Sequence, residues 1–365
     1  MRRAFTLVVA ALAMLPSEHL LAQGAGTVLL PDPSNPTTRV GTRGANFLEI
    51  GVGARGQAMA GAYASVAEGV TALYWNPAGI AEIEGPSAAI TITKLYGDLG
   101  INHTFAGAAM PIGGGGVFGL AITSLSSGDI ERTTEAFPDG GDPTFGRTFS
   151  YTATAAGLYY GRRLTDRLNI GFGVKYASEG IDNAQAHYVG VDIGTMFRTG
   201  LYGTRIAASL SNLGTSGRFQ GAAIDTFMVG NNGTVPFQGG TSSLQMPTLF
   251  RFSIRSDMVG ASDALLSTNK DHDLMAIAEA DNAIDTDIQL TLGVQYSFRN
   301  MLFARIGKKW YNEKQTAFRS ASYGLSFGGG VRLPLSGGRG FDFDYAYTNM
   351  GELNNVQVFS LELGF

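Results

Sequence analysis

The chain has 365 residues, of which 15% are charged, 10% are aromatic and 51 are glycine. Ordinary soluble domains carry roughly 25% charged residues, and the net charge of −4 gives no basic surface for nucleic acid. The lack of cysteine excludes disulfides and thiolate metal sites. This composition is unusual for a soluble enzyme and typical of a β-sheet with one apolar and one polar face.

Residues 1–22 have the pattern of a secretory signal peptide. Arg2 and Arg3 precede the apolar stretch "AFTLVVAALAML", and Ala22 suits the position before a cleavage site. That stretch is shorter than the about 20 residues that a transmembrane helix needs. Residues 23–45 are rich in proline and polar residues, which predicts a flexible leader. We therefore expect an exported protein that no helix anchors.

Residues 46–85 mix apolar residues with glycine and alanine and show no strand period. Such a segment is too rich in glycine for persistent isolated helices, so we expect short helical turns packed against something larger. Near its end, Asn76, Pro77, Ala78 and Gly79 predict a tight turn, because proline fixes its own φ and pushes the preceding residue out of the helical region. Taken alone, this turn would lie on the surface.

From residue 86 onward the apolar residues recur at every second position. In "DIQLTLGVQYSF" (287–298), for example, the apolar and polar side chains alternate along the whole segment. This pattern is typical of half-buried strands. It predicts about fourteen strands at 87–96, 101–110, 116–127, 148–162, 169–180, 187–198, 204–213, 246–258, 272–280, 287–298, 301–310, 320–333, 341–348 and 354–365. Most are as long as a tilted membrane strand, which needs about 9–11 residues.

The lengths of the connections support an antiparallel transmembrane barrel. The two longest, 128–147 and 214–245, both follow odd-numbered strands, so they lie at the same end. Most even-numbered connections are short, as periplasmic turns are, and 259–271 is the exception. The fold class is therefore all-β, with a barrel over residues 86–365. The last strand, "VFSLELGF", ends at Phe365 and resembles the C-terminal strand signal of outer-membrane barrels.

The alternation places charged residues on the polar phase of the strands, which faces the lumen if the apolar phase faces lipid. A charge on the lipid side costs about 2–4 kcal/mol near the bilayer midplane. We expect a structural network of paired charges, and ligand binding by some of them is the alternative. The candidate network comprises Lys175, Arg205, Arg251, Arg255, Arg305, Arg332, Asp342, Asp344 and Glu362.

The sequence offers little support for catalysis or a cofactor. The motif "GVGARG" (51–56) matches G-x-G-x-x-G but lacks the βαβ context of a dinucleotide site. His103, His187 and His272 lie on separate segments without ligand spacing, and "DHD" (271–273) is the one local cluster of acids and histidine. No nucleophile, base and oxyanion donors come together. We expect no enzyme, no metal and no cofactor. An enzyme is the alternative, because barrel hydrolases exist in outer membranes.

The loop 214–245 is nearly uncharged and carries apolar residues, among them Phe219, Phe227, Met228 and Phe237. An exposed apolar loop suits a protein partner or the capture of an apolar ligand. A glycine-rich loop that folds over its own barrel mouth is the alternative.

The block "ANFLEIGVGARGQAMAGAYASVAEGVTALYWNPAGIAEIEG" (45–85) resembles the N-terminal signature of the PorV/PorQ family, within the wider group of FadL-like outer-membrane transporters. The segments "LSNLG" (210–214) and "LTLGVQYSFRNMLFARIGKKW" (290–310) are similar as well. The resemblance implies a fourteen-stranded barrel whose lumen holds residues 46–85 as a hatch. It places the turn at Asn76–Gly79 inside the barrel.

The resemblance also implies a function and partners. Proteins of the PorV/PorQ type bind and shuttle secreted cargo proteins together with other components of type IX secretion and surface attachment. FadL-like members instead take up hydrophobic small molecules such as long-chain fatty acids, which is the alternative function here. Both imply the outer membrane and its lipid as surroundings, and neither involves nucleic acid.

Overall fold

The computed structural model describes residues 41–364 except 98, 142–146, 225, 231–232, 238, 261–262, 311–323 and 335–339. The predicted signal peptide, residues 23–40 of the leader and Phe365 lie outside the described residues. No helix in the described part is long and apolar enough to cross a membrane.

Fourteen long antiparallel strands in the described residues form a closed barrel, as predicted. They are β1 (Ser87–Leu95), β2 (Ile101–Gly113), β3 (Gly116–Ser126), β6 (Tyr151–Arg163), β7 (Leu168–Ile181), β8 (Ala184–Arg198), β9 (Arg205–Gly214), β15 (Leu249–Gly260), β17 (His272–Ala283), β18 (Gln289–Phe298), β19 (Leu302–Trp310), β20 (Leu325–Pro334), β21 (Gly340–Asn349) and β22 (Asn355–Gly364). Each pairs with its neighbours in chain order, and β1 pairs with β22, from Ser87↔Gly364 to Lys94↔Gln357. Closure leaves no unpaired sheet edge between the first and last strands.

The two phases of each strand have opposite surroundings. On β18, for example, Leu290 and Leu292 are more than half exposed, whereas the alternate residues Thr291 and Gln295 are buried. The same alternation of buried and exposed residues runs along β6, β7 and β8. The apolar phase therefore forms the outer surface, and the polar phase faces the lumen.

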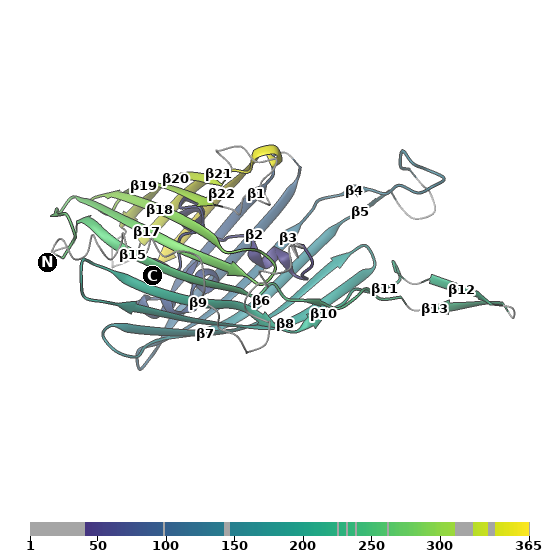
Figure 1. The fold of residues 1–365 in the computed structure, drawn as a ribbon, viewed down its shortest axis with the longest axis horizontal. Helices are drawn as coiled ribbons and strands as arrows, with labels where there is room; N and C mark the ends of the chain where they lie inside the picture. The colour runs from purple at the N-terminus through teal and green to yellow at the C-terminus, as the bar shows by residue number, and fades with distance from the viewer. Residues whose placement is uncertain are drawn as a thin grey trace, which may run out of the picture. The chain divides into compact units, whose positions relative to one another are not determined.

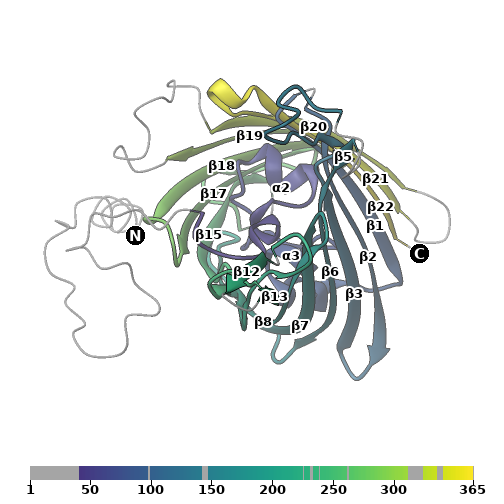
Figure 2. The same cartoon turned by 90° about the vertical axis from the view of Figure 1, so that its right-hand side faces the viewer.

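Four short helical segments precede β1 and lie inside the ring of strands, where α2 and α3 are visible (Figure 2). They are η1 (Asn46–Glu49), α2 (Ala54–Ala58), α3 (Ala72–Trp75) and η2 (Pro77–Glu82). We refer to residues 46–85 as the hatch. Helix α2 packs against β20, β21 and β22, whereas η2 packs against β6, β7 and β8, so the hatch reaches opposite walls.

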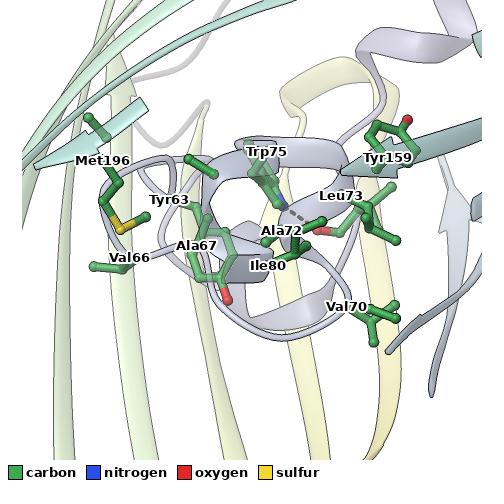
Figure 3. Close-up of a cluster of buried hydrophobic side chains, with 14 of the residues drawn as sticks. Tyr63, Val66, Ala67, Val70, Ala72, Leu73, Trp75, Ile80, Tyr159 and Met196 are labelled. Carbon is green, nitrogen blue, oxygen red and sulfur yellow. Dashed lines mark hydrogen bonds between the residues drawn. The ribbon is translucent and has the colours of Figure 1, made fainter. Parts of the chain in front are cut away.

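The core is made by the hatch and the inner wall rather than by two packed sheets. Tyr63, Leu73 and Ile80 are among the largest fully buried side chains, and they lie around Trp75 (Figure 3). The Trp75 Nε1 atom donates to the Val52 carbonyl at 2.7 Å, which joins two hatch segments. The short helices persist because tertiary packing stabilises them.

We call the barrel end with the two longest connections the loop end, and the opposite one the turn end. The long connections contain short strands that the sequence analysis did not predict, and β4–β5 and β12–β13 extend beyond the barrel strands (Figure 1). These connections hold β4 (Ile130–Glu131), β5 (Thr148–Phe149), β10 (Ser216–Gly217), β11 (Gln220–Gly221), β12 (Thr226–Gly230), β13 (Gly233–Phe237) and β14 (Leu244–Gln245). At the turn end, the one long connection in the described residues contains β16 (Ser267–Thr268). The 3-10 helix η4 (Gly351–Leu353) lies at the loop end, in the connection from β21 to β22.

Candidate functional site

The turn predicted at Asn76–Gly79 joins α3 to η2 inside the barrel. Asn76 caps η2, because its Oδ1 atom accepts from the backbone N–H of Ala78 at 3.1 Å, and Pro77 occupies the first helical position. The Asn76 Nδ2 atom donates to the carbonyls of Ala64 and Thr195, both at 3.1 Å. One fully buried side chain thus fixes the turn to another part of the hatch and to strand β8.

Two glycines in the wall make room for this turn. A Cβ atom on Gly171 would lie 2.1 Å from the backbone carbon of Pro77, and one on Gly194 would lie 2.0 Å from Asn76 Oδ1. Real Cβ contacts are never this close, so a larger residue at either position would displace the hatch. Part of the high glycine content therefore serves the approach of the hatch to the wall.

Carboxylates on the wall hold the hatch through its backbone. The Glu279 Oε2 atom accepts from the N–H groups of Tyr63 at 3.0 Å and Ala64 at 2.8 Å. Glu362 Oε1 accepts from the N–H of Val70 at 2.8 Å. These hydrogen bonds pair backbone N–H groups that would otherwise be buried without a partner, so they fix the hatch to the wall. Sequence reasoning missed Glu279, although its place on the inward phase of β17 was a usable signal.

All nine charged residues of the candidate network lie on the lumen side, and each has a polar partner. The pairs are Lys175–Asp192 at 2.6 Å, Arg205–Glu82 at 3.1 Å, Arg251–Asp281 at 3.9 Å, Arg255–Asp257 at 3.2 Å, Arg332–Asp342 at 2.7 Å, Arg305–Asp344, and Glu362 with the N–H of Val70. Two of these pairs join residues that the sequence analysis named together. The other partners, among them Glu82 on the hatch, were missed because register and hatch path decide them.

The motif "LSNLG" forms a bulge in the wall between β8 and β9. Asn212 has a left-handed backbone, with φ 59°, and the register shifts between Val191 and Ile193. The Asn212 N–H donates to Asp192 Oδ1, and its Oδ1 atom accepts from Lys175 Nζ, both at 2.7 Å. Asparagine tolerates this backbone better than most residues. The buried Lys175–Asp192 pair therefore stabilises the bulge.

Hatch residues line cavities toward both barrel ends. The loop-end cavity has a volume of about 310 Å³ and is lined by Glu49, Tyr74, Trp75, Arg251, Asp281 and Lys309, among others. Two turn-end cavities, of about 350 and 290 Å³, share Arg55, Glu68 and Arg332. A small apolar cavity of about 20 Å³ lies near Leu48 and Phe105. The turn-end cavities are thus rich in charged and polar side chains, whereas the loop-end cavity combines such side chains with apolar ones, among them Leu95, Leu249 and Val356.

Two hatch side chains in the loop-end cavity, those of Glu49 and Tyr74, have raised pKa values. Burial, followed by the charge of Asp285, raises the pKa of Glu49 to about 7, against the opposing effect of Arg251. Burial also raises the pKa of Tyr74 to about 12, so its hydroxyl stays neutral. Glu49 therefore changes charge near neutral pH.

The three histidines in the described residues do not form a site. His187 and His272 are exposed on the outer surface, where they pair with the hydroxyls of Tyr176 at 2.8 Å and Tyr296 at 2.7 Å. His103 is buried in the lumen wall without a hydrogen-bond partner in the described residues. Within those residues, no group of three or more metal-binding side chains is positioned to hold an ion.

The predicted apolar loop is only partly described. Phe219 is half-buried and packs against the cluster that contains Tyr188 and Met246. Phe227 and Met228 belong to β12 and Phe237 to β13, and their side chains lie outside the described part of the structure.

The comparisons with known proteins identify the fold. No protein-family model matches the chain, and no curated protein matches it by sequence. Among solved structures, the toluene transporter TbuX of Ralstonia pickettii matches with a TM-score of 0.53 and 13% identity, over 86% of this chain and 97% of that one. The toluene transporter TodX of P. putida matches with a TM-score of 0.51 and 12% identity, over 86% and 96% of the chains. The monoaromatic hydrocarbon channel CymD matches with a TM-score of 0.52 and 12% identity, over 87% and 98%. These likenesses show that the chain shares the barrel fold of these two transporters and this channel.

Proposed function

We propose that this protein is an outer-membrane transporter of small molecules and that the hatch gates their passage. The observation that carries the proposal is a hatch that occupies the lumen of a closed barrel and is held only by noncovalent contacts. The fold shared with transporters and a channel supports it. The protein would then act by binding and moving solutes rather than by catalysis.

The outer surface supports a membrane location. Exposed leucine, isoleucine, valine and phenylalanine side chains recur on the outward phase of successive strands, for example Leu120 and Ile122 on β3, and Leu158 on β6. In water, an exposed apolar surface of this extent would cause aggregation, whereas lipid accommodates it. The signal-like residues 1–22 are consistent with export to an outer membrane.

Passage through the lumen requires the hatch to move, because its buried helices contact walls on both sides. Engineered disulfides test this directly in a chain without native cysteine. A Cβ atom on Gly293 would lie 3.3 Å from the Ala62 Cβ atom, close to the about 3.5–4.5 Å of natural disulfides. It would also lie 2.9 Å from the Met59 Cβ atom, so the single variant G293C must show uptake before the disulfide is interpreted. The double variant A62C/G293C therefore joins the hatch to β18.

We expect oxidised A62C/G293C to lose uptake and the reduced protein to regain it. The variants would be expressed in the outer membrane of a porin-deficient bacterial host without a barrel of this type. Uptake of radiolabelled glucose, benzoate and oleate would be measured before and after reduction, with A62C and G293C as matched single-cysteine controls. Unchanged uptake by the fully oxidised protein would show that the hatch is not a gate. If none of the three probes enters even after reduction, the proposed transport of these solute classes is wrong.

A second candidate function is the shuttling of secreted cargo proteins, as in the PorV/PorQ branch of type IX secretion. The observation that favours it is the pair of extensions β4–β5 and β12–β13, which lie beyond the barrel strands where a protein partner has access (Figure 1). Deletion of 226–237 would then abolish co-purification of surface proteins that share a C-terminal sorting domain. Loss of uptake without any such partner in the intact protein would favour transport instead.

The sizes of the cavities bear on the class of small molecule that this protein would transport. TbuX and TodX are toluene transporters, and hydrophobic small molecules are the cargo that the resemblance implies for this chain. Of the cavities described above, however, the one without a buried ion pair or carboxylate in its lining is the smallest, at about 20 Å³. That volume is far below the about 300–1,000 Å³ of typical ligand pockets.

A further inference from the structure

The loop-end cavity contains several buried polar atoms without hydrogen-bond partners. Four of its lining residues contribute one such atom each within the described structure, namely Tyr74 Oη, Arg251 Nε, Asp281 Oδ1 and Thr286 Oγ1. Arg251 and Asp281 are only 3% and 6% exposed. Buried polar atoms are almost always paired with protein, water or ligand atoms. Four of them around one cavity indicate that a polar molecule completes it.

The charges around the cavity largely neutralise one another. Lys309 Nζ lies 2.8 Å from Asp281 Oδ2, whereas Arg251 Nε lies 3.9 Å from Asp281 Oδ1, too far for a hydrogen bond. Arg251 also lies over the rings of Tyr74 and Trp75, with its guanidinium carbon 5.4 and 5.2 Å from their centroids. With Glu49 ionised, the lining carries two cations and two anions, so a ligand needs no net charge.

We propose that the loop-end cavity binds a small, uncharged, hydroxyl-rich solute of the monosaccharide class. A hydroxyl group both donates and accepts, so adjacent hydroxyls can donate to Asp281 Oδ1 and accept from Arg251 Nε. The hydroxyls of Tyr74 and Thr286 can act in either role. A volume of about 310 Å³ lies at the small end of ligand pockets. An apolar solute would instead leave all four atoms unpaired. This inference rests on the proposed function, for which it names the solute class.

The native tryptophans provide a binding assay. The chain has two tryptophans, and Trp75 lines the cavity whereas Trp310 is 47% exposed on β19. In the purified W310F protein in detergent, Trp75 is the only tryptophan and reports on the cavity. We expect its emission to change saturably with D-glucose and not with glycine, benzoate or toluene.

Hydroxyl deletions locate the site. We expect Y74F and T286V each to weaken glucose binding about fivefold, the usual effect of one hydrogen bond, and the double variant to weaken it further. Y63F makes the same change as Y74F in a hatch residue that lines a turn-end cavity instead, so it should bind glucose normally. Circular dichroism of each variant would confirm that the barrel is intact.

The binding measurements either support or overturn the proposed glucose site. Saturable glucose binding that Y74F and T286V weaken, and Y63F does not, supports the site. Absence of glucose binding, binding that both deletions leave unchanged, or preferential binding of glycine, benzoate or toluene overturns it. The disulfide experiment separates the two proposals. If oxidation of A62C/G293C still blocks uptake while glucose fails to bind, the solute class is wrong and the gate stands. If glucose binds but the disulfide has no effect on uptake, the binding site stands and the gate is wrong.

Discussion

Replacement of Lys175 by methionine should lower the free energy of unfolding of the barrel, and the contacts of Lys175 define by how much. Lys175 Nζ lies 2.6 Å from Asp192 Oδ2 and donates to Asn212 Oδ1 at 2.7 Å, and the Asp192 side chain is 1% exposed. Methionine preserves the apolar stem but leaves the Asp192 carboxylate buried without a cation, with hydrogen bonds from the Asn212 N–H and the Tyr159 hydroxyl. Breaking a buried ion pair from one side costs about 3–5 kcal/mol. That is a large share of the about 5–15 kcal/mol by which folded proteins are stable.

Urea unfolding of the barrel in lipid vesicles, followed by tryptophan fluorescence, measures this cost. With a slope of about 2 kcal/mol per molar urea, K175M should lower the unfolding midpoint by about 2 M. Adding D192N to K175M removes the unpaired charge and keeps an acceptor oxygen for the Asn212 N–H. We therefore expect the double variant to be more stable than K175M by at least about 1 kcal/mol. A K175M midpoint within about 0.3 M of the parent would show that the pair is not desolvated and would refute this reasoning.

Three further predictions concern the hatch and the bulge. G194A should destabilise the barrel by about 1–3 kcal/mol through overpacking, because its Cβ would lie 2.0 Å from Asn76 Oδ1; a melting temperature equal to that of the parent would contradict the close approach. N212A should lower the stability of the barrel by about 2 kcal/mol, because alanine makes no side-chain hydrogen bonds and disfavours a φ of 59°. N212G should separate the two effects, because glycine restores only the backbone freedom. The E49Q variant tests pH dependence. Folding raises the pKa of the Glu49 carboxyl from 4.5 to about 7, so this carboxyl is protonated in both the folded and the unfolded state at low pH. It contributes a stability that is lost as pH rises from 4.5 through 7. E49Q should therefore match the parent at pH 4.5 and exceed its stability at pH 8, by about 1–3 kcal/mol after allowance for partial exposure; equal thermal unfolding curves at both pH values would argue against the shift.

The pattern along each strand determined the barrel. In 287–298 the apolar and polar residues alternate without interruption, and the structure has β18 at Gln289–Phe298 with the apolar phase outward. The predicted segment 148–162 was less exact, because it divides into β5, which pairs with β4, and the barrel strand β6. The short strands in 214–245 were missed because glycine-rich stretches carry little alternation.

The composition of the lumen was predictable, but its pairing was not. Alternation assigns Lys175 and Arg205 to the inner face without any knowledge of their partners. Asp192 meets Lys175 only through the register of β7 and β8, and Glu82 meets Arg205 only because the hatch passes that wall.

The sequence by itself thus determined the strands, their two faces and the turn at Asn76–Gly79, because periodicity and proline stereochemistry act within a few residues. The tertiary structure alone decided which groups meet inside the barrel. Glu279 binds the backbone of Tyr63 across 216 residues of chain, and the Tyr74, Arg251 and Asp281 side chains share a cavity only after the hatch docks. Such contacts depend on barrel closure and on the path of the hatch, which no local pattern encodes.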